Sequence, residues 1–172
     1  MMTTNKSITF LVVLMIWSAL VMAVAATPPQ PSVSLCARGE KTIFACSIRK
    51  PAKLISLCAS PNLSASQGYI QYRFGLPRKI ELEYPKSREG SQGAFAYDHY
   101  FRAQVDRTEI GFKVDGYEYA IFDDYNGEQK PARHGQGIRI TAPDGKETTL
   151  SCRGRAQADY ADLADVFGNT GQ

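Results

Sequence analysis

Hydrophobic and polar residues alternate with a period of two over most of the chain after residue 42, as in strands that bury one face. In one such run, Ile80, Leu82 and Tyr84 alternate with Glu81 and Glu83. The runs have the length of strands, and β-branched and aromatic residues are frequent in them. The alternation predicts nine strands, within residues 42–48, 54–59, 70–74, 80–84, 95–102, 110–114, 117–121, 138–140 and 149–151.

The breaks between these runs contain the residues that tight turns need. Asp115-Gly116 favours a two-residue hairpin because both positions tolerate a positive φ. Gly-Leu-Pro-Arg at 75–78 and Pro-Asp-Gly-Lys at 143–146 separate two further pairs of runs. Short breaks of this kind predict antiparallel neighbours in a meander. Two longer polar gaps, at 85–93 and 124–136, predict surface loops, where function is often found.

The pattern changes near the C-terminus. Ala156, Tyr160, Leu163 and Phe167 recur at helical spacing, which predicts one short helix over 156–167. The meander must close or fold over, because a single sheet would leave its apolar face in water. We therefore expect a mostly β fold: a single antiparallel meander forming a small barrel or barrel-like sandwich, with one short C-terminal α-helix.

The first 26 residues have the parts of a secretory signal peptide. Lys6 precedes a hydrophobic run over 8–24, which ends in the small residues Ala-Val-Ala-Ala at 23–26. A retained membrane anchor is the alternative, since a span needs ~20 apolar residues. We expect a periplasmic or secreted protein with no membrane insertion after cleavage. The predicted parts are a signal peptide at 1–26, a Pro-rich linker at 27–34, a single disulfide-linked β domain at 35–168 and a frayed tail at 169–172.

The four cysteines are Cys36, Cys46, Cys58 and Cys152. In an exported domain an even number of cysteines implies disulfides, with three pairings open. Zinc is the weaker alternative, because no Cys-x-x-Cys spacing occurs. A hairpin centred on Ala52 would place Cys46 opposite Cys58, within disulfide reach. This predicts the pairs Cys46–Cys58 and Cys36–Cys152.

Composition and motifs argue against several classes of partner and chemistry. Lys and Arg number 20 against 17 Asp and Glu, and they are scattered, so nucleic acid is not an expected partner. The sequence has no Gly-x-Ser-x-Gly, no His-Glu-x-x-His and no phosphate-binding glycine loop. We predict no cofactor and no catalytic residues.

The two histidines, His99 and His134, are the candidates for an enzyme. His99 lies in a strand run, and Asp98 cannot orient it, because adjacent strand residues point to opposite faces. His134 falls in a predicted loop, where a solvated side chain is the simpler interpretation. A small envelope hydrolase using either histidine with a loop carboxylate is therefore an alternative function.

One segment gathers oxygen ligands around a glycine. Asp123, Asp124, Asn126 and Glu128 surround Gly127, and calcium takes six or more oxygens around a tight turn. The alternating spacing of a calcium loop is absent, so a turn with solvated carboxylates is the simpler interpretation. We predict no metal, with these four residues as a weak calcium candidate.

Tyrosine is abundant, and the period of two separates inward from outward positions. Tyr69 and Tyr100 are predicted to point outward, as are Arg73 and Arg102. Tyrosine and arginine are favoured in interface hot spots. These four residues are our predicted contact surface for a partner.

Four segments carry a resemblance to a known group of proteins: Phe44-x-Cys46, KLISLCAS at 53–60, GYIQYRFG at 68–75 and GKETTLSC at 145–152. Through them the chain resembles small exported proteobacterial proteins of uncharacterised function. The resemblance covers most of the domain and implies export and a β-rich fold, without an activity. In size and cysteine usage the chain also looks loosely like periplasmic lysozyme inhibitors, without a match to their inhibitory motif.

These observations favour a non-enzymatic exported binding module, inhibitor-like or immunity-like, whose partner is an envelope or secreted protein. The basis is a disulfide-tied β scaffold with polar loops and no catalytic motif. The alternatives are the small hydrolase and a structural envelope component.

Overall fold

A computed structural model describes residues 34–48 and 52–168 of the 172. They belong to one compact unit, Ser32–Gln172. The predicted signal peptide, all of the linker but Ser34, and the predicted tail lie outside the described residues. Within the described part, no helix combines the length and the apolar composition that crossing a membrane requires.

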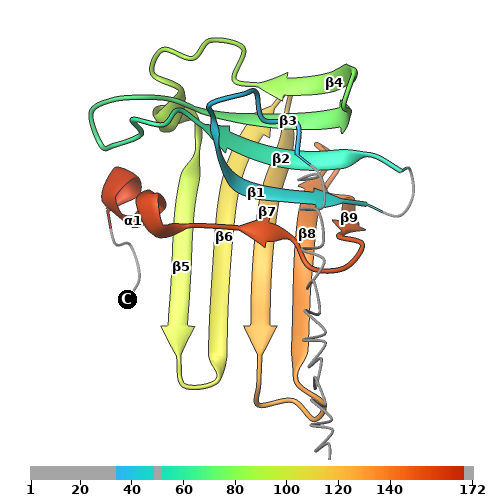
Figure 1. Cartoon of the computed structure of the whole chain (residues 1–172). Helices are drawn as coiled ribbons and strands as arrows, with labels where there is room; N and C mark the ends of the chain where they lie inside the picture. The colour runs from blue at the N-terminus through green and yellow to red at the C-terminus, as the bar shows by residue number, and fades with distance from the viewer. Residues whose placement is uncertain (1–33, 49–51, 169–172) are drawn as a thin grey trace, which may run out of the picture. The chain divides into compact units, whose positions relative to one another are not determined.

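Two antiparallel sheets form the domain, each of five strands (Figure 1). The first has the order β10-β1-β2-β3-β4, and the second is the meander β5-β6-β7-β8-β9. The strands of the first sheet run across those of the second (Figure 1). The first sheet contains β1 (Lys41–Ser47), β2 (Leu54–Ala59), β3 (Ile70–Leu76), β4 (Lys79–Tyr84) and β10 (Gln157–Ala158). The second contains β5 (Ala96–Arg102), β6 (Val105–Val114), β7 (Tyr117–Asn126), β8 (Arg133–Thr141) and β9 (Glu147–Ser151).

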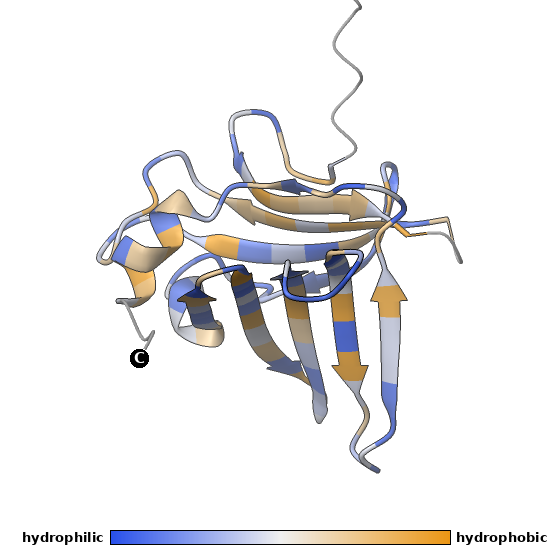
Figure 2. Cartoon of the chain, turned by 90° about the horizontal axis from the view of Figure 1, so that it is seen from below, coloured by the Kyte–Doolittle hydropathy of each residue, from blue (hydrophilic) through white to orange (hydrophobic). Residues whose placement is uncertain are grey.

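The core lies between the two sheets, and we call the face that each sheet turns toward it the inner face. Figure 2 shows hydrophobic and hydrophilic bands alternating along the strands, as the period of two requires. Aromatic rings join the layers: the centroid of Tyr72 on β3 lies 4.8 Å from that of Phe112 on β6, and Phe112 stacks on Tyr119 of β7 at 4.9 Å. Leu163 of α1 (Ala161–Phe167) is fully buried and extends this core beyond the sheets.

The predicted fold class is confirmed in its coarser part: the domain is mostly β, antiparallel, with a short C-terminal helix. The strands form two separate sheets rather than one closed barrel. Between β4 and β5 the chain passes through residues 85–95, which include the short 3-10 helix Ser91–Ala94. Beyond β9, an isolated bridge between Ile48 and Cys152 links the sheets at one corner, and the chain then returns to pair with β1.

The predicted helix over 156–167 is half right. Its second part is α1, but Gln157 and Ala158 form β10 and pair with Ala45 and Phe44 of β1. The backbone N–H of Asp159 also donates to the carbonyl of Ile43, at 2.8 Å. Without β10, the edge of β1 would expose unpaired backbone groups, and this requirement overrides the helical spacing of the side chains.

The turn chemistry at Asp115-Gly116 predicted its hairpin correctly, since both residues have positive φ, 50° and 80°, between β6 and β7. The gap at 124–136 is shorter than predicted. β7 continues to Asn126 and β8 begins at Arg133, so polar residues at both ends of this gap are strand residues.

The cysteines pair differently from the prediction. The disulfides are Cys36–Cys58, closing 22 residues, and Cys46–Cys152, closing 106. The predicted pairs Cys46–Cys58 and Cys36–Cys152 are therefore wrong.

The β1–β2 register explains the error. Ile48 N–H donates to the carbonyl of Lys53, and the pairing of β1 with β2 is shifted by three residues from that of a hairpin centred on Ala52. Cys46 consequently lies opposite Ile55 and not opposite Cys58. Cys46 belongs to the core between the sheets, whereas Cys58 alternates with the core residue Leu57 and points to the other face of the sheet. Two cysteines on opposite faces of one sheet cannot be bridged.

Candidate functional site

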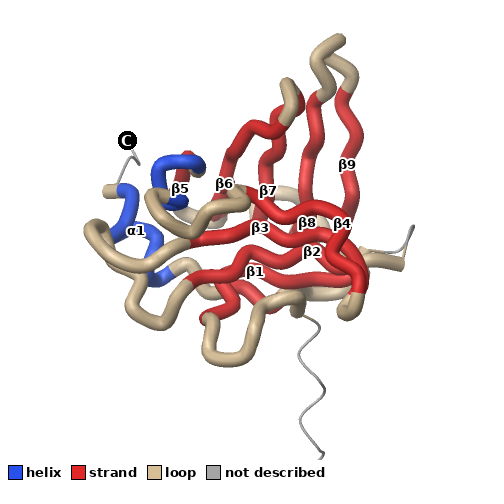
Figure 3. Tube along the Cα trace, turned by 90° about the horizontal axis from the view of Figure 1, so that it is seen from above, coloured by secondary structure: helices blue, strands red, loops and turns tan. Residues whose placement is uncertain are grey.

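The ends of β5–β8 extend past the first sheet (Figures 1 and 3). We call residues 98–108 and 123–136 the open end of the second sheet. Its residues lie in cross-strand rows, so faces follow from the register. His99, Thr108, Asp123 and Gln136 form one inner-face row across β5–β8, and the row beyond it contains Phe101, Asp106, Tyr125 and His134. The outer face carries the residues between them.

Large aromatic side chains are exposed at the open end. Phe101 is 71% exposed, Tyr125 41% and Tyr100 39%. The other exposed large hydrophobic residues of the described part are Leu76, Ile80 and Tyr117, which lie in other regions. By the strand register Tyr100 lies on the outer face, and Phe101 and Tyr125 lie on the inner face. Exposed aromatic residues are typical of interaction surfaces.

The outer face of the open end is rich in arginine and surrounds a shallow cavity of about 790 Å³ lined by Tyr100 and Arg102. Arg102 forms a two-pronged ion pair with Glu128, with Nη2 2.7 Å from Oε2. This hydrogen bond raises the pKa of Arg102 and lowers that of Glu128. Arg107 and Arg133, by contrast, form no ion pair with another described residue.

The tip of the open end is fixed by contacts between its two hairpins. The backbone N–H of Gly127 donates to the carbonyl of Gln104 at 2.7 Å. Gln104 adopts a positive φ of 64°, and Asn126 Oδ1 accepts from the N–H of Glu128 at 3.0 Å. The Arg102–Glu128 pair also spans the hairpins. The two turns are therefore held in one arrangement before any partner binds.

The inner face brings both histidines into one cleft, and each contacts an aspartate. His99 Nε2 lies 2.9 Å from Asp106 Oδ1, and His134 Nε2 lies 2.6 Å from Asp123 Oδ1. The other oxygen of Asp123 accepts from Gln136 at 2.8 Å and from the hydroxyl of Tyr160 at 3.2 Å. Burial first, and then this carboxylate, raise the pKa of Tyr160.

The hydrolase prediction placed a histidine beside a loop carboxylate, and the structure gives a different arrangement. His134 lies on β8 rather than in a solvated loop, and both carboxylates are strand residues. Asp106 was missed, and Asp123 was considered only as a calcium candidate, because both become neighbours of the histidines only through the strand register. Among the described residues, neither histidine hydrogen-bonds to a hydroxyl or thiol nucleophile.

The four candidate calcium ligands do not converge. Asp123 and Asp124 point to opposite faces of β7, where Asp123 contacts His134 and Asp124 contacts Arg139. Asn126 caps the backbone of Glu128, and the Glu128 carboxylate pairs with Arg102. Strand geometry thus disperses residues that are close in sequence, and the four side chains do not share one site in this arrangement.

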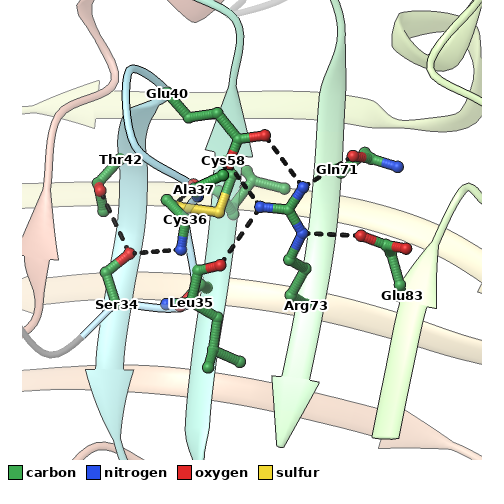
Figure 4. The surroundings of a disulfide bond; sticks show 12 residues. Ser34, Leu35, Cys36, Ala37, Glu40, Thr42, Cys58, Gln71, Arg73 and Glu83 are labelled. Atoms are coloured by element: carbon green, nitrogen blue, oxygen red, sulfur yellow. Dashed lines mark hydrogen bonds and ion pairs between the residues drawn. A yellow bond between two sulfur atoms is a disulfide. The ribbon is translucent and has the colours of Figure 1, made fainter. Parts of the chain in front are cut away.

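Arg73, a predicted contact residue, is buried. Residues 34–40 pack on the outer face of the first sheet, and Figure 4 shows the Arg73 guanidinium between this segment and Glu83. Arg73 Nη2 donates to Glu40 Oε1 at 3.0 Å, and its Nε donates to Glu83 at 2.8 Å. The Arg73 and Glu40 side chains are each only 4% exposed. Burial opposes ionisation of Glu40, but hydrogen bonds from Arg73, Ala37 and Tyr69 leave its pKa below the ordinary value.

Tyr69 belongs to the same covered network. Its hydroxyl donates to Glu40 at 2.8 Å, and the guanidinium of Arg88 lies 4.5 Å from the centre of its ring. The four predicted contact residues therefore divide into two regions. Tyr69 and Arg73 stabilise the cover of the first sheet, while Tyr100 and Arg102 are exposed at the open end of the second.

One group of potential metal ligands occurs in the described residues: Cys36, Glu40 and Cys58. Its two cysteines form a disulfide and are not available as thiolate ligands. In comparisons with protein-family models, with curated proteins and with solved structures, no match to this chain was found.

Proposed function

We propose that this is an exported, non-enzymatic binding protein that uses the open end of its second sheet to dock onto an envelope or secreted protein, in the manner of an inhibitor or immunity protein. The observation that carries the proposal is the exposure of three aromatic side chains, Tyr100, Phe101 and Tyr125, at a sheet end that the first sheet does not cover. Exposing these rings to water has an energetic cost that docking would remove.

The rigidity of the tip supports this role. The Gly127–Gln104 hydrogen bond and the Arg102–Glu128 pair hold both turns before binding. A surface that is ordered in advance loses less conformational entropy on association, so more of the contact energy appears as affinity. Arg107 and Arg133 have no carboxylate partner within the described domain and are available to acidic groups of the bound protein.

Export is part of the proposal. The leader-like sequence at 1–26 and the resemblance to small exported proteins support it, and the two disulfides fit an oxidising compartment such as the periplasm or the exterior. A reducing cytosol would not maintain either disulfide.

The test is capture of the partner by the exported protein, compared across variants of matched chemistry. Tyr125 and Tyr117 lie at opposite ends of β7 and are both 41% exposed. Tyr125→Ala and the double variant Tyr100→Ala/Arg102→Ala should each lower partner recovery at least tenfold, since interface hot spots contribute about 2 kcal/mol or more. Tyr117→Ala is the control and should recover the partner as the wild type does.

Equal recovery by all of these variants would show that the open end is not the docking surface. A photo-crosslinker placed at residue 101 gives a second readout, because Phe101 is the most exposed aromatic residue of this surface. A crosslink to the same partner is expected from this position and not from position 117.

A further inference from the structure

The inner face of the open end contains a cleft that shares only Tyr125 with the proposed docking surface. We propose that the cleft between this face and the β10–α1 segment binds a neutral, polyhydroxylated ligand, the chemistry of a saccharide. The cleft has a volume of about 660 Å³, within the range of small-molecule sites. The sheet forms one wall, and Ala156, Ala158 and Tyr160 contribute to the other.

Both histidines can hydrogen-bond to such a ligand. Asp106 and Asp123 each occupy one ring nitrogen, Nε2, and the second nitrogen of each ring has no hydrogen-bond partner among the described residues. His99 lies on β5 and His134 on β8, so two strands separate them, or about 14 Å at ~4.8 Å per strand. A ligand that contacts both histidines must be elongated, as an oligosaccharide is.

Thr108 adds a third group between the histidines. It lies in the same row as His99, lines the cleft, and its hydroxyl makes no hydrogen bond to another described residue. A hydroxyl can donate and accept, and a free imidazole nitrogen can do one or the other according to its protonation. Ligand hydroxyl groups match this mixed set, because they also do both.

The charge of the cleft favours a neutral ligand. Asp123 already accepts three hydrogen bonds, and Asp106 accepts one from His99. Arg155, at the rim, forms no ion pair with a described residue and offsets one of the two carboxylates. An anionic ligand would meet the carboxylates, and a cationic one would meet Arg155 and compete with the histidines.

Aromatic rings supply the apolar part of the site. Tyr97, Tyr125 and Tyr160 line the cleft, and Tyr125 is exposed at its mouth. Rings that present a flat apolar face beside fixed polar groups suit ligands that are amphipathic in the same way. A sugar ring has C–H groups on its faces and hydroxyl groups around its edge.

The test uses the fact that the chain has only two histidines. Their ring protons give two assignable sets of NMR signals. These signals are followed while chitotetraose or maltotetraose is added to the exported protein. The highest saccharide concentration is about 10 mM, which is tenfold above a weak Kd of ~1 mM. We expect at least one of these saccharides to shift the signals of both rings together. Tetraglutamate and tetralysine peptides serve as the charged comparison and should not reproduce the shifts.

Variants separate this site from the docking surface. Thr108→Val keeps the side-chain shape, and His134→Ala removes one end of the site; each should weaken saccharide binding about tenfold. Tyr100→Ala/Arg102→Ala lies on the other face and should bind the saccharide as the wild type does, whatever happens to partner capture. The amide spectrum checks that each variant is folded.

Three results would overturn the inference. The first is that neither saccharide moves either histidine ring, and the second is that only a charged peptide does. The third is that folded Thr108→Val and folded His134→Ala both bind the saccharide with wild-type affinity. None of these results bears on the docking proposal, because Tyr100, Phe101 and Arg102 of the docking surface lie outside the cleft.

Discussion

The outer face of the first sheet and the open end of the second are built from the same residue types and differ in what covers them. Each contains a tyrosine and a strand arginine that is paired with glutamate. Residues 34–40 cover the first region, and Cys36–Cys58 attaches them to β2. The open end has no such cover. An arginine on the polar side of a strand is therefore structural or available according to whether another segment lies over it.

The consequence for energetics is a difference in solvent screening. Arg73 and Glu40 interact at 4% exposure, where leaving either one unpaired has a large cost. Arg102 and Glu128 interact at 46% exposure, where water and ions screen the attraction. The first pair fixes the fold, and the second is available to arrange a binding surface.

The largest expected effect is that of Arg73→Ala. It leaves the buried carboxylate of Glu40 and the half-buried carboxylate of Glu83 without their guanidinium, and we expect a loss of about 3–5 kcal/mol in the free energy of unfolding. Arg102→Ala is the matched control and should leave the urea midpoint nearly unchanged. Urea denaturation followed by circular dichroism measures both; equal midpoints for the two variants would contradict the distinction between the regions.

The next effect tests what attaches the cover. Replacing both Cys36 and Cys58 by Ser removes a disulfide between residues 22 positions apart. In the loop-entropy model this lowers the free energy of unfolding by about 3 kcal/mol. Amide exchange should rise first in residues 34–40 and at Arg73, since these lose their attachment. Uniform exchange across both sheets would show instead that the disulfide stabilises the whole domain and not the cover.

A smaller effect is expected from pH. Burial raises the pKa of Glu40, but its hydrogen bonds, above all from Arg73, bring the pKa in the folded protein below 4.5, the value expected when unfolded. The unfolded state therefore binds more protons in this range, and the contribution of Glu40 is present above pH 4.5 and is lost as pH falls through the folded pKa. Glu40→Gln should show a shallower decline in stability below pH 4.5, measured as urea midpoints between pH 3 and 6 with Glu128→Gln as the exposed control.

Much of the fold was predictable because alternation and turn residues act locally. The Asp115-Gly116 hairpin and the antiparallel meander follow from such signals. The disulfide pairing was not predictable. A three-residue difference in the β1–β2 register decides whether Cys58 shares a face of the sheet with Cys46. The helix was predicted too long. The spacing of hydrophobic side chains does not reveal that the backbone of Gln157 and Ala158 pairs with β1.

The candidate site was predictable only in part. Tyr100 and Arg102 were selected by residue type and by the alternation of faces along a strand. Because they are two residues apart on β5, they point to the same face. The same alternation placed Tyr69 and Arg73 outward as well, but it cannot show that Glu40 returns to bind them both. The His–Asp contacts depend on the register of β5 with β6 and of β7 with β8, which a single sequence does not specify.

The smallest expected effect on stability tests the open end alone. A Cβ at Gly127 would lie 2.7 Å from the Tyr125 hydroxyl and 3.3 Å from the Gln104 carbonyl, so Gly127→Ala must displace the exposed end of Tyr125. The displaced group is a mobile side chain, and we expect a loss of at most about 1 kcal/mol in the free energy of unfolding. Partner capture should nevertheless fall, because the tip is no longer fixed in its binding arrangement.

Gly135→Ala, whose Cβ would meet Phe122 at an ordinary 3.6 Å, is the control on the same open end and should preserve both stability and capture. If Gly127→Ala captures the partner as well as Gly135→Ala does, then the fixed tip is not what the partner recognises, and the difference between the covered and the open region lies in charge and exposure rather than in rigidity.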